Sequence, residues 1–381
     1  MFVSRRVSIV RCADYESERV EGALAECLLP LGGIEAFVGR GSRILIKPNL
    51  LASRPPEGAV TTHPAVVRAA IRAVQSAGAE VVLGDSPGGR NTPERYAALL
   101  RRTGLAAVLE ECGCEAVFFD GEVSDLPSPD GRTYRRFRVA RAVADADAIV
   151  SLSKFKTHQL TLCTGAVKNC FGYIPGVAKA EYHLHTGQDP SRFASLLLDL
   201  YQARPPVLSV MDAVVGMEGN GPSNGRPRHV GLLLASPHAP DLDFVEALLM
   251  GFDPFDVPTI AEAAERGLGP LSAGEIEAFG VGIDEGRAVG FARPEAQLVS
   301  RIPTPILAAV SRLFAVRPRI VADRCRGCGA CVENCPPGAI DFRGPVPLIR
   351  HQDCIRCFCC QELCPADAIA IDRPYLRRLI G

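Results

Sequence analysis

Two short runs of cysteine near the end of the chain constrain its fold more than any other feature. Both follow the pattern Cys-x2-Cys-x2-Cys-x3-Cys-Pro, and nine of the 15 cysteines lie between Cys325 and Cys364. Close spacing on a tight loop is typical of thiolates that bind metal, and so many cysteines in a reducing compartment favour metal over disulfides. The runs are Cys325, Cys328, Cys331 and Cys335, then Cys354, Cys357, Cys360 and Cys364.

This pattern resembles the bacterial two-cluster ferredoxins over about residues 318–373. The resemblance implies two 4Fe–4S clusters, with the fourth cysteine of each run bound to the cluster of the other run. One cluster would be held by Cys325, Cys328, Cys331 and Cys364, and the other by Cys354, Cys357, Cys360 and Cys335. Zinc is the alternative, but zinc sites usually separate their cysteine pairs more widely. The extra thiol, Cys359, is expected to be packed.

The chain before the cysteines alternates helical segments with short apolar strands up to about residue 290. Strands are expected at 43–47, 80–84, 115–119, 146–152, 206–211 and 230–234, and helices at 16–29, 64–75, 93–109, 159–170, 192–201, 241–250 and 259–266. This alternation predicts an α/β fold, with a mostly parallel sheet and helices on both faces. We expect an α/β domain over 1–292, a helical connector over 293–317 and a small α+β ferredoxin-like domain over 318–374.

Charge and hydropathy narrow the range of functions. The formal net charge is −1, which does not indicate a nucleic-acid partner, and hydrophobic residues make up an ordinary 47%. We expect no transmembrane segment and no signal peptide, so the cytoplasm is the predicted location. The phosphate loop of NTPases, the Gly-x-Gly-x-x-Gly turn of dinucleotide enzymes and the Gly-x-Ser-x-Gly elbow of hydrolases are all absent.

Lysine is rare in this sequence, and its distribution predicts a second site. The chain has 5 lysines against 37 arginines, and four of the five fall within residues 154–179. Because arginine serves almost everywhere as the surface charge, the lysines are candidates for anion binding, proton transfer or covalent chemistry. The alternative is chance clustering on a solvated surface. The five are Lys47, Lys154, Lys156, Lys168 and Lys179.

Polar residues follow several of the expected strands at their carboxyl ends, where open parallel sheets bind ligands. Lys154, Lys156 and His158 alternate and would share one side of an extended segment, so we expect a pocket for a small anion. Asp212 and Glu218 alternatively suit a divalent cation. The catalytic candidates are Lys154, Lys156, His158, Lys168 and His183. The substrate-binding candidates are Lys47, Asn49, Asp85, Ser86, Thr164, Asn169, Asp212 and Glu218.

Residues 1–290 also resemble the domain of unknown function family 362, whose members often carry a C-terminal ferredoxin domain. The stretches that carry this resemblance are Ile46-Lys-Pro-Asn-Leu50, Gly84-Asp-Ser-Pro-Gly88, Lys154-Phe-Lys-Thr-His158, Gly165-Ala-Val-Lys-Asn169 and Met211-Asp-Ala-Val-Val-Gly-Met-Glu-Gly-Asn-Gly-Pro222. A second similarity, Gly165-Ala-Val-Lys168 followed by His183, is to nickel-dependent lactate racemases and would imply a lysine-bound cofactor. Here Ala166 stands near where those racemases have a second glycine.

Taken together, these features favour an enzyme, an iron–sulfur oxidoreductase that passes low-potential electrons to an anionic substrate or cofactor. Its expected partners are a redox protein, either a ferredoxin or a reductase, and a small anionic molecule. Lys154, Lys156 and Lys168 would bind the anion, and His158 or His183 would handle protons. Two alternatives stay open: a non-catalytic electron carrier or assembly factor that docks a partner protein, and a racemase-like isomerase.

Overall fold

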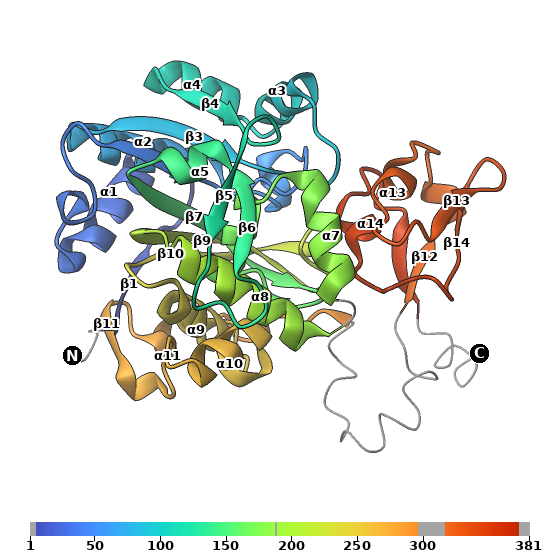
Figure 1. Ribbon diagram of the computed structural model, residues 1–381. Coiled ribbons are helices and arrows are strands. Elements are labelled where there is room, and N and C mark those ends of the chain that lie inside the picture. The colour runs from blue at the N-terminus through green and yellow to red at the C-terminus, as the bar shows by residue number, and fades with distance from the viewer. Residues whose placement is uncertain (1–4, 187–188, 296–316, 373–381) are drawn as a thin grey trace.

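A computed structural model describes residues 5–186, 189–295 and 317–372. Figure 1 shows a large α/β part and a small C-terminal part, drawn in orange and red, which lies beside helix α7 (Gly176–Thr186) of the large part. The connector expected over 293–317 lies almost wholly outside the described residues. The residue ranges given above for the α/β domain, the connector and the ferredoxin-like domain therefore stay predictions.

A mixed, mostly parallel sheet forms the centre of the large part, which confirms the predicted α/β class. Strands β7, β2, β3 and β4 are parallel to one another, as β9 is to β7. A two-residue strand, β8 (Leu162–Cys163), pairs with the end of β7. The strand order is β11 (Ile276–Gly280), β1 (Arg5–Arg11), β10 (Arg226–Ser236), β9 (Leu208–Glu218), β7 (Ala148–His158), β2 (Arg43–Lys47), β3 (Glu80–Asp85), β4 (Glu115–Phe118).

Strand β10 departs from the parallel arrangement because the loop 219–225 joins it directly to β9. So short a link permits only an antiparallel hairpin, since a parallel pair needs a long crossover connection. β10 is accordingly antiparallel to both β9 and β1. The parallel pairing of β9 with β7 places Asp212 of β9 beside Lys154 of β7.

Helices cover both faces of the sheet, and side chains alternate between two hydrophobic cores. Ile44 and Ile46 of β2 belong to one core, and Leu45 belongs to the other. The first core includes α1 (Ser17–Leu28), α2 (Pro64–Ser76), α3 (Pro93–Arg102) and α4 (Leu105–Cys112). The second includes α6 (Ala166–Asn169), α8 (Pro190–Ala203), α9 (Ala239–Leu249) and α10 (Pro258–Glu265). The remaining elements of this part are β5 (Val123–Pro127), β6 (Arg136–Ala140), α5 (Arg141–Asp145) and α11 (Ile283–Gly286).

Two of the expected helices are wrong: one is reduced to a short helix near the end of its range, and the other is divided in two. In place of a helix over 159–170, β7 continues past residue 152 to His158, and β8 and the short α6 follow. Leu162 and Gly165 have φ values of 64° and 63°, which are incompatible with a right-handed helix. The helix expected over 93–109 is divided into α3 and α4 because Gly104 is left-handed, with φ at 79°.

The C-terminal part consists of two short antiparallel strand pairs and two short helices. Its small core is formed partly by cysteines, including Cys331, Cys360 and Cys364. Domains with so few apolar side chains are usually completed by disulfides or bound metal. Its elements are β12 (Arg317–Ile320) with β15 (Ile369–Asp372), β13 (Ile340–Phe342) with β14 (Pro347–Ile349), α13 (Ala330–Glu333) and α14 (Cys359–Glu362).

Candidate functional site

The eight cysteines of the two runs line two separate cavities in the C-terminal part. The fourth cysteine of each run lies with three cysteines of the other run, as the resemblance to two-cluster ferredoxins implies. One cavity is lined by Cys325, Cys328, Cys331 and Cys364, and the other by Cys335, Cys354, Cys357 and Cys360. We call these the outer and the inner cysteine set, respectively.

The chemistry of these cavities fits an iron–sulfur cluster. Backbone amides point at cysteine sulfur atoms: the N–H of Ala339 donates to Cys335 Sγ at 3.2 Å, and the N–H of Ala368 donates to Cys364 Sγ at 3.2 Å. Such bonds stabilise cluster thiolates. Within the described ranges, no three His, Cys, Asp or Glu side chains are close enough to share a single ion. Four thiols around a cavity suit a cluster better, because each thiolate binds a different iron atom.

A larger cavity of about 200 Å³ lies between the α/β part and the C-terminal part. Its α/β wall is built from the ends of β2 and β3, from α6 and from α7, and the opposite wall includes Cys335, Cys359 and Glu362. Cys335 and Pro336 also line the cavity of the inner cysteine set. The predicted strand-end pocket and the inner set therefore share a wall.

The structure brings most of the predicted pocket residues to this interdomain cavity. Those that line it are Lys47, Asn49, Asp85, Ser86, Thr164, Lys168, Asn169 and His183. Five other candidates do not line it, because their side chains are engaged elsewhere in the large part or at the domain contact: Lys154, Lys156, His158, Asp212 and Glu218.

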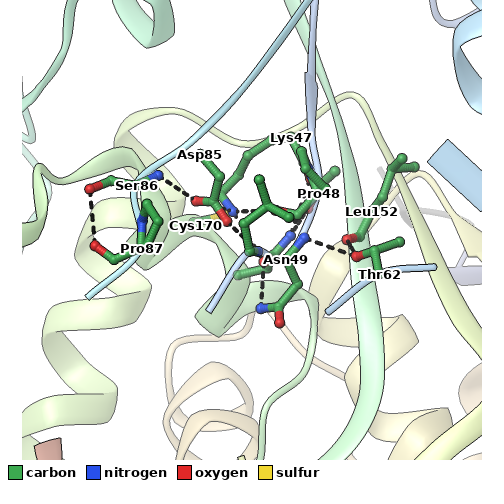
Figure 2. Close-up of polar contacts among 12 residues, drawn as sticks. Lys47, Pro48, Asn49, Thr62, Asp85, Ser86, Pro87, Leu152 and Cys170 are labelled. Atoms are coloured by element: carbon green, nitrogen blue, oxygen red, sulfur yellow. Dashed lines mark hydrogen bonds and ion pairs between the residues drawn. The ribbon is translucent and has the colours of Figure 1, made fainter. Parts of the chain in front are cut away.

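A buried ion pair supports the α/β side of the cavity. Lys47 Nζ lies 2.8 Å from Asp85 Oδ1 and donates to Asn169 Oδ1 at 3.1 Å. Asp85 also accepts a hydrogen bond from the backbone amide of Leu50 at 2.7 Å. Figure 2 shows a further one, from the backbone amide of Ser86 at 2.9 Å. Lys47 is thus fully engaged and holds strands β2 and β3 together at their ends.

Three polar groups in the cavity have no partner among the described residues. Lys168, which is half-buried, makes no hydrogen bond or ion pair there, whereas Lys179 donates to the carbonyl of Ser86. Thr164 Oγ1 and His183 Nδ1 are buried and unbonded. Buried polar groups are nearly always hydrogen-bonded. This combination of an ammonium, a hydroxyl and an imidazole nitrogen therefore indicates a ligand site.

Burial adjusts the acid–base character of the cavity. It lowers the pKa of Lys168, against the opposing effect of the Glu362 carboxylate, and it lowers the pKa of Lys179 to about 8. Burial also lowers the pKa of His183 to about 4. The imidazole of His183 stacks on Phe193 with ring centroids 4.7 Å apart, which fixes its orientation. At neutral pH the cavity therefore holds a neutral imidazole beside lysines that release protons more readily than usual.

His158 connects the two parts of the chain. Its Nδ1 accepts the N–H of Leu160 at 3.1 Å, so the proton of the neutral ring lies on Nε2, which is 3.2 Å from Glu362 Oε1. Burial lowers the pKa of His158 to about 4. Burial alone would raise the pKa of Glu362, but the contact with His158 brings it down to about 2. An anionic carboxylate from the C-terminal part thus faces a neutral histidine of β7.

The other predicted residues do not line the cavity and have partners of their own. Lys154 Nζ lies 2.6 Å from Asp212 Oδ2, and Tyr15 Oη donates to Asp212 Oδ1 at 2.8 Å. Glu218 instead contacts Arg226 and Arg228. The two carboxylates have different basic partners, so the structure does not support the divalent-cation site considered from the sequence. Lys156 donates to Asn49 Oδ1 at 2.7 Å.

Sequence reasoning missed two residues of the cavity wall, Glu362 and Cys359. Both lie on α14, among the cysteines of the second run, and line a pocket whose other wall comes from much earlier in the chain. One signal was available, since Glu362 is a charged residue between the predicted ligands Cys360 and Cys364. Its partner His158 could not be inferred, because nothing in the local pattern shows how the two parts pack.

Acidification from about pH 6.5 to pH 4 is expected to destabilise the protein. His63, His158 and His183 each have a pKa of about 4 in the folded state, below the ordinary 6.5. At these three histidines the unfolded chain binds more protons in this window, so their contribution to the free energy of unfolding falls as pH falls, by up to about 1.4 kcal/mol per pH unit for each histidine. Asp243 and Glu246, whose pKa values burial raises, oppose this slope in part. Urea unfolding followed by circular dichroism at several pH values measures this slope.

Comparison with known proteins places the chain in a family. Residues 44–247 match the model described as a domain of unknown function (DUF362). The chain belongs to this family. A relative, the thylakoid-associated protein sll1697 of Synechocystis sp., is 37% identical over 270 residues, which cover 71% of this chain and 82% of that protein. Residues 324–368 match a 4Fe-4S dicluster domain, so this DUF362 protein carries an iron–sulfur binding domain and the resemblance is confirmed.

One solved structure with a similar backbone is the lactate racemase apoprotein from Thermoanaerobacterium thermosaccharolyticum. It shares 11% identity and a TM-score of 0.40, and the match covers 64% of this chain and 57% of the racemase. No helix within the described residues is long and apolar enough to cross a bilayer. Because the name of the Synechocystis relative associates that protein with thylakoids, a cytoplasmic location stays a prediction for this chain.

Proposed function

We propose that this DUF362 protein is an iron–sulfur oxidoreductase that acts on a small anionic molecule in the interdomain cavity. The observation that carries the proposal is that Cys335 lines both this cavity and the cavity of the inner cysteine set. The outer and inner sets would each hold one 4Fe–4S cluster, which supplies single-electron transfer when bound. A redox-active group could thus stand directly behind the wall of a lysine-bearing pocket.

The unpartnered groups of the cavity define the ligand. Lys168 supplies a positive charge, and the Thr164 hydroxyl can donate or accept a hydrogen bond. Hydrogen bonds between an ammonium and an anionic oxygen are stronger than neutral ones, so a carboxylate or phosphate suits this arrangement. The volume of about 200 Å³ is smaller than that of a drug-sized pocket, which indicates a small metabolite.

Lys179 is better suited than the histidines to transfer protons to this ligand. Its pKa of about 8 lies close to neutral pH, where proton transfer is most efficient. His183 has a pKa of about 4 and can instead offer its unbonded Nδ1 as a hydrogen-bond partner. The proposal therefore keeps Lys168 as the anion-binding residue. It gives Lys154 and Lys156, which do not line the cavity, a supporting role through Asp212 and Asn49.

Anaerobic purification followed by native mass spectrometry tests the proposal. We expect the full-length protein to carry a bound small anion, and we expect dithionite-reduced protein to be reoxidised faster when that anion is added. The non-catalytic alternative would instead be supported by three results together. The protein would co-purify with one partner protein, it would carry no bound small molecule, and small carboxylates or phosphates would not reoxidise it. A covalent adduct on Lys168 would indicate the racemase-like alternative.

A further inference from the structure

We propose that a small acidic electron-carrier protein docks on the face of the C-terminal part that points away from the α/β part. This inference rests on the proposed function, because it assumes that both cysteine sets hold redox-active groups. We call this surface the entry face. It is formed by the loop of the outer cysteine set and the turn between β13 and β14, and its residues are Arg324, Arg326, Cys328, Phe342 and Arg343.

The two cysteine sets differ in where they lie. The inner set shares Cys335 with the wall of the interdomain cavity, whereas the outer set shares no lining residue with it. Of the eight cysteines, Cys328 of the outer set is the one that is exposed. Figure 1 shows β13 and β14 on the side of the C-terminal part that is remote from the α/β part. A carrier protein could therefore approach the outer set without displacing anything from the cavity.

The exposed surface around Cys328 is continuous. A side chain at Gly329 would lie 3.5 Å from the ring of Phe342, and one at Gly327 would lie 3.3 Å from the carbonyl of Pro345. The loop thus abuts the hairpin turn, and Gly327 and Cys328 are both exposed. Phe342 is 46% exposed, and it supplies the kind of apolar side chain that interface centres favour.

The entry face has excess positive charge. Arg324, Arg326 and Arg343 are exposed and make no ion pair with any described residue. Of the acidic residues next to them in the chain, Asp323 precedes Arg324, and Asp341, two residues before Arg343, is paired with Arg350. Other arginines of this part are paired, as Arg350 is with Asp341 and Asp353. Unpaired arginines around an exposed cluster ligand complement a negatively charged partner and would speed its association.

The partner that fits is a small acidic protein that carries one electron. Plant-type ferredoxins belong to this chemical class, and we choose one as the probe. In the transfer the reduced carrier loses one electron and the acceptor in this chain gains one; no bond forms and no proton moves. The transfer itself therefore needs only a close approach at Cys328, which the exposed loop allows.

Calorimetry at low and high salt tests the entry face. It measures the affinity of the full-length, anaerobically purified protein for a reduced plant-type ferredoxin. We expect binding that weakens as salt rises. The double variant Arg326→Glu/Arg343→Glu should weaken it by about tenfold or more. The matched control Arg101→Glu/Arg135→Glu, at exposed arginines of the α/β part that have no ion pair among the described residues, should bind like the wild type.

Dithionite serves as a reductant that needs no docking surface. We expect the Arg326→Glu/Arg343→Glu variant to be reduced by dithionite at the wild-type rate, but by the ferredoxin more slowly. Equal ferredoxin affinity in the variant and the wild type, or no binding by the wild type, would overturn the docking proposal. Salt-dependent binding by a protein that proves free of iron would leave the entry face supported and would contradict the proposed function instead.

Discussion

Replacing Asp212 with alanine is expected to lower the free energy of unfolding by about 3–5 kcal/mol. Asp212 is fully buried, and its carboxylate accepts hydrogen bonds from Lys154 Nζ at 2.6 Å, from Tyr15 Oη at 2.8 Å and from the backbone N–H of His63 at 2.9 Å. Its removal leaves the buried ammonium without its counter-ion, with only Tyr15 Oη, at 3.0 Å, as an acceptor among the described residues. It also leaves the Tyr15 hydroxyl and the N–H groups of His63 and Val214 without this acceptor. Lys154 must then lose its proton or draw water into the sheet.

Urea unfolding measured by circular dichroism checks this effect. The matched control is Asp125→Ala, which breaks an exposed pair with Arg136 and should change the free energy of unfolding by no more than about 1 kcal/mol. The double variant Lys154→Met/Asp212→Leu should recover much of the loss, because it removes both charges together. If Asp212→Ala lowered the free energy of unfolding by no more than the control does, the Lys154–Asp212 pair would not be a structural element of the sheet.

Replacing Lys168 with methionine is expected to weaken anion binding in the interdomain cavity by about 10- to 150-fold. This range corresponds to the loss of one hydrogen bond to a charged group, about 1.5–3 kcal/mol. Because the ammonium has no partner among the described residues and burial lowers its pKa, its removal should not destabilise the fold. Calorimetry with inorganic phosphate and malonate as probe anions, together with the melting temperature, measures both effects.

The control for Lys168 is Arg135→Met, which removes an exposed positive charge of the α/β part and should leave anion affinity unchanged. Equal affinities of the Lys168→Met variant and the wild type would show that this lysine does not bind the anion. The same conclusion would follow if neither phosphate nor malonate bound to the wild type. A fall in melting temperature for Lys168→Met would indicate a structural role instead.

The variant His183→Gln tests the predicted loss of stability on acidification that was assigned to the buried histidines. Between about pH 6.5 and 4, the free energy of unfolding of this variant should depend less steeply on pH than that of the wild type. The difference equals the contribution of one histidine, because glutamine has no proton to bind in this range whereas the buried imidazole of His183 has a lowered pKa. His185→Gln is the matched control, since His185 lies on the same helix and is exposed. An unchanged slope in the His183 variant would contradict the assignment.

Much of the α/β part could be predicted because the relevant signals are local. Short apolar runs identify β2 and β3, and the rule that ligands bind at the carboxyl ends of parallel strands led directly to Lys47 and Asp85. The grouping of the cysteines came instead from the resemblance to two-cluster ferredoxins, because each cavity combines three cysteines of one run with the fourth of the other. The strand-end inferences needed no knowledge of distant contacts.

The end of β7 could not be predicted for a physical reason. Lys154, Lys156 and His158 are polar, and a buried strand is ordinarily recognised by apolar residues, so the strand was expected to end at residue 152. Their polar groups are satisfied by residues that lie far away in the chain, namely Asp212, Asn49 and Glu362. Only the folded arrangement shows that these buried charges have partners.

The interdomain cavity has the same limitation. Its α/β wall was predicted, but its second wall depends on how the C-terminal part packs against the α/β part. That contact is made by single polar residues such as Arg54, which donates to the carbonyl of Cys364 at 3.0 Å. Ser223 Oγ similarly donates to the carbonyl of Glu362 at 3.0 Å. Such scattered contacts leave no periodic pattern in a sequence.

The content of iron and acid-labile sulfide in full-length protein purified without oxygen is the most direct test of a redox centre beside the lysine pocket. We predict about eight iron and eight sulfide per chain, with four of each lost in a Cys335→Ser variant if the inner set holds its own cluster. Protein that is colourless, or that contains zinc in place of iron and sulfide, would contradict the proposed electron transfer into the cavity.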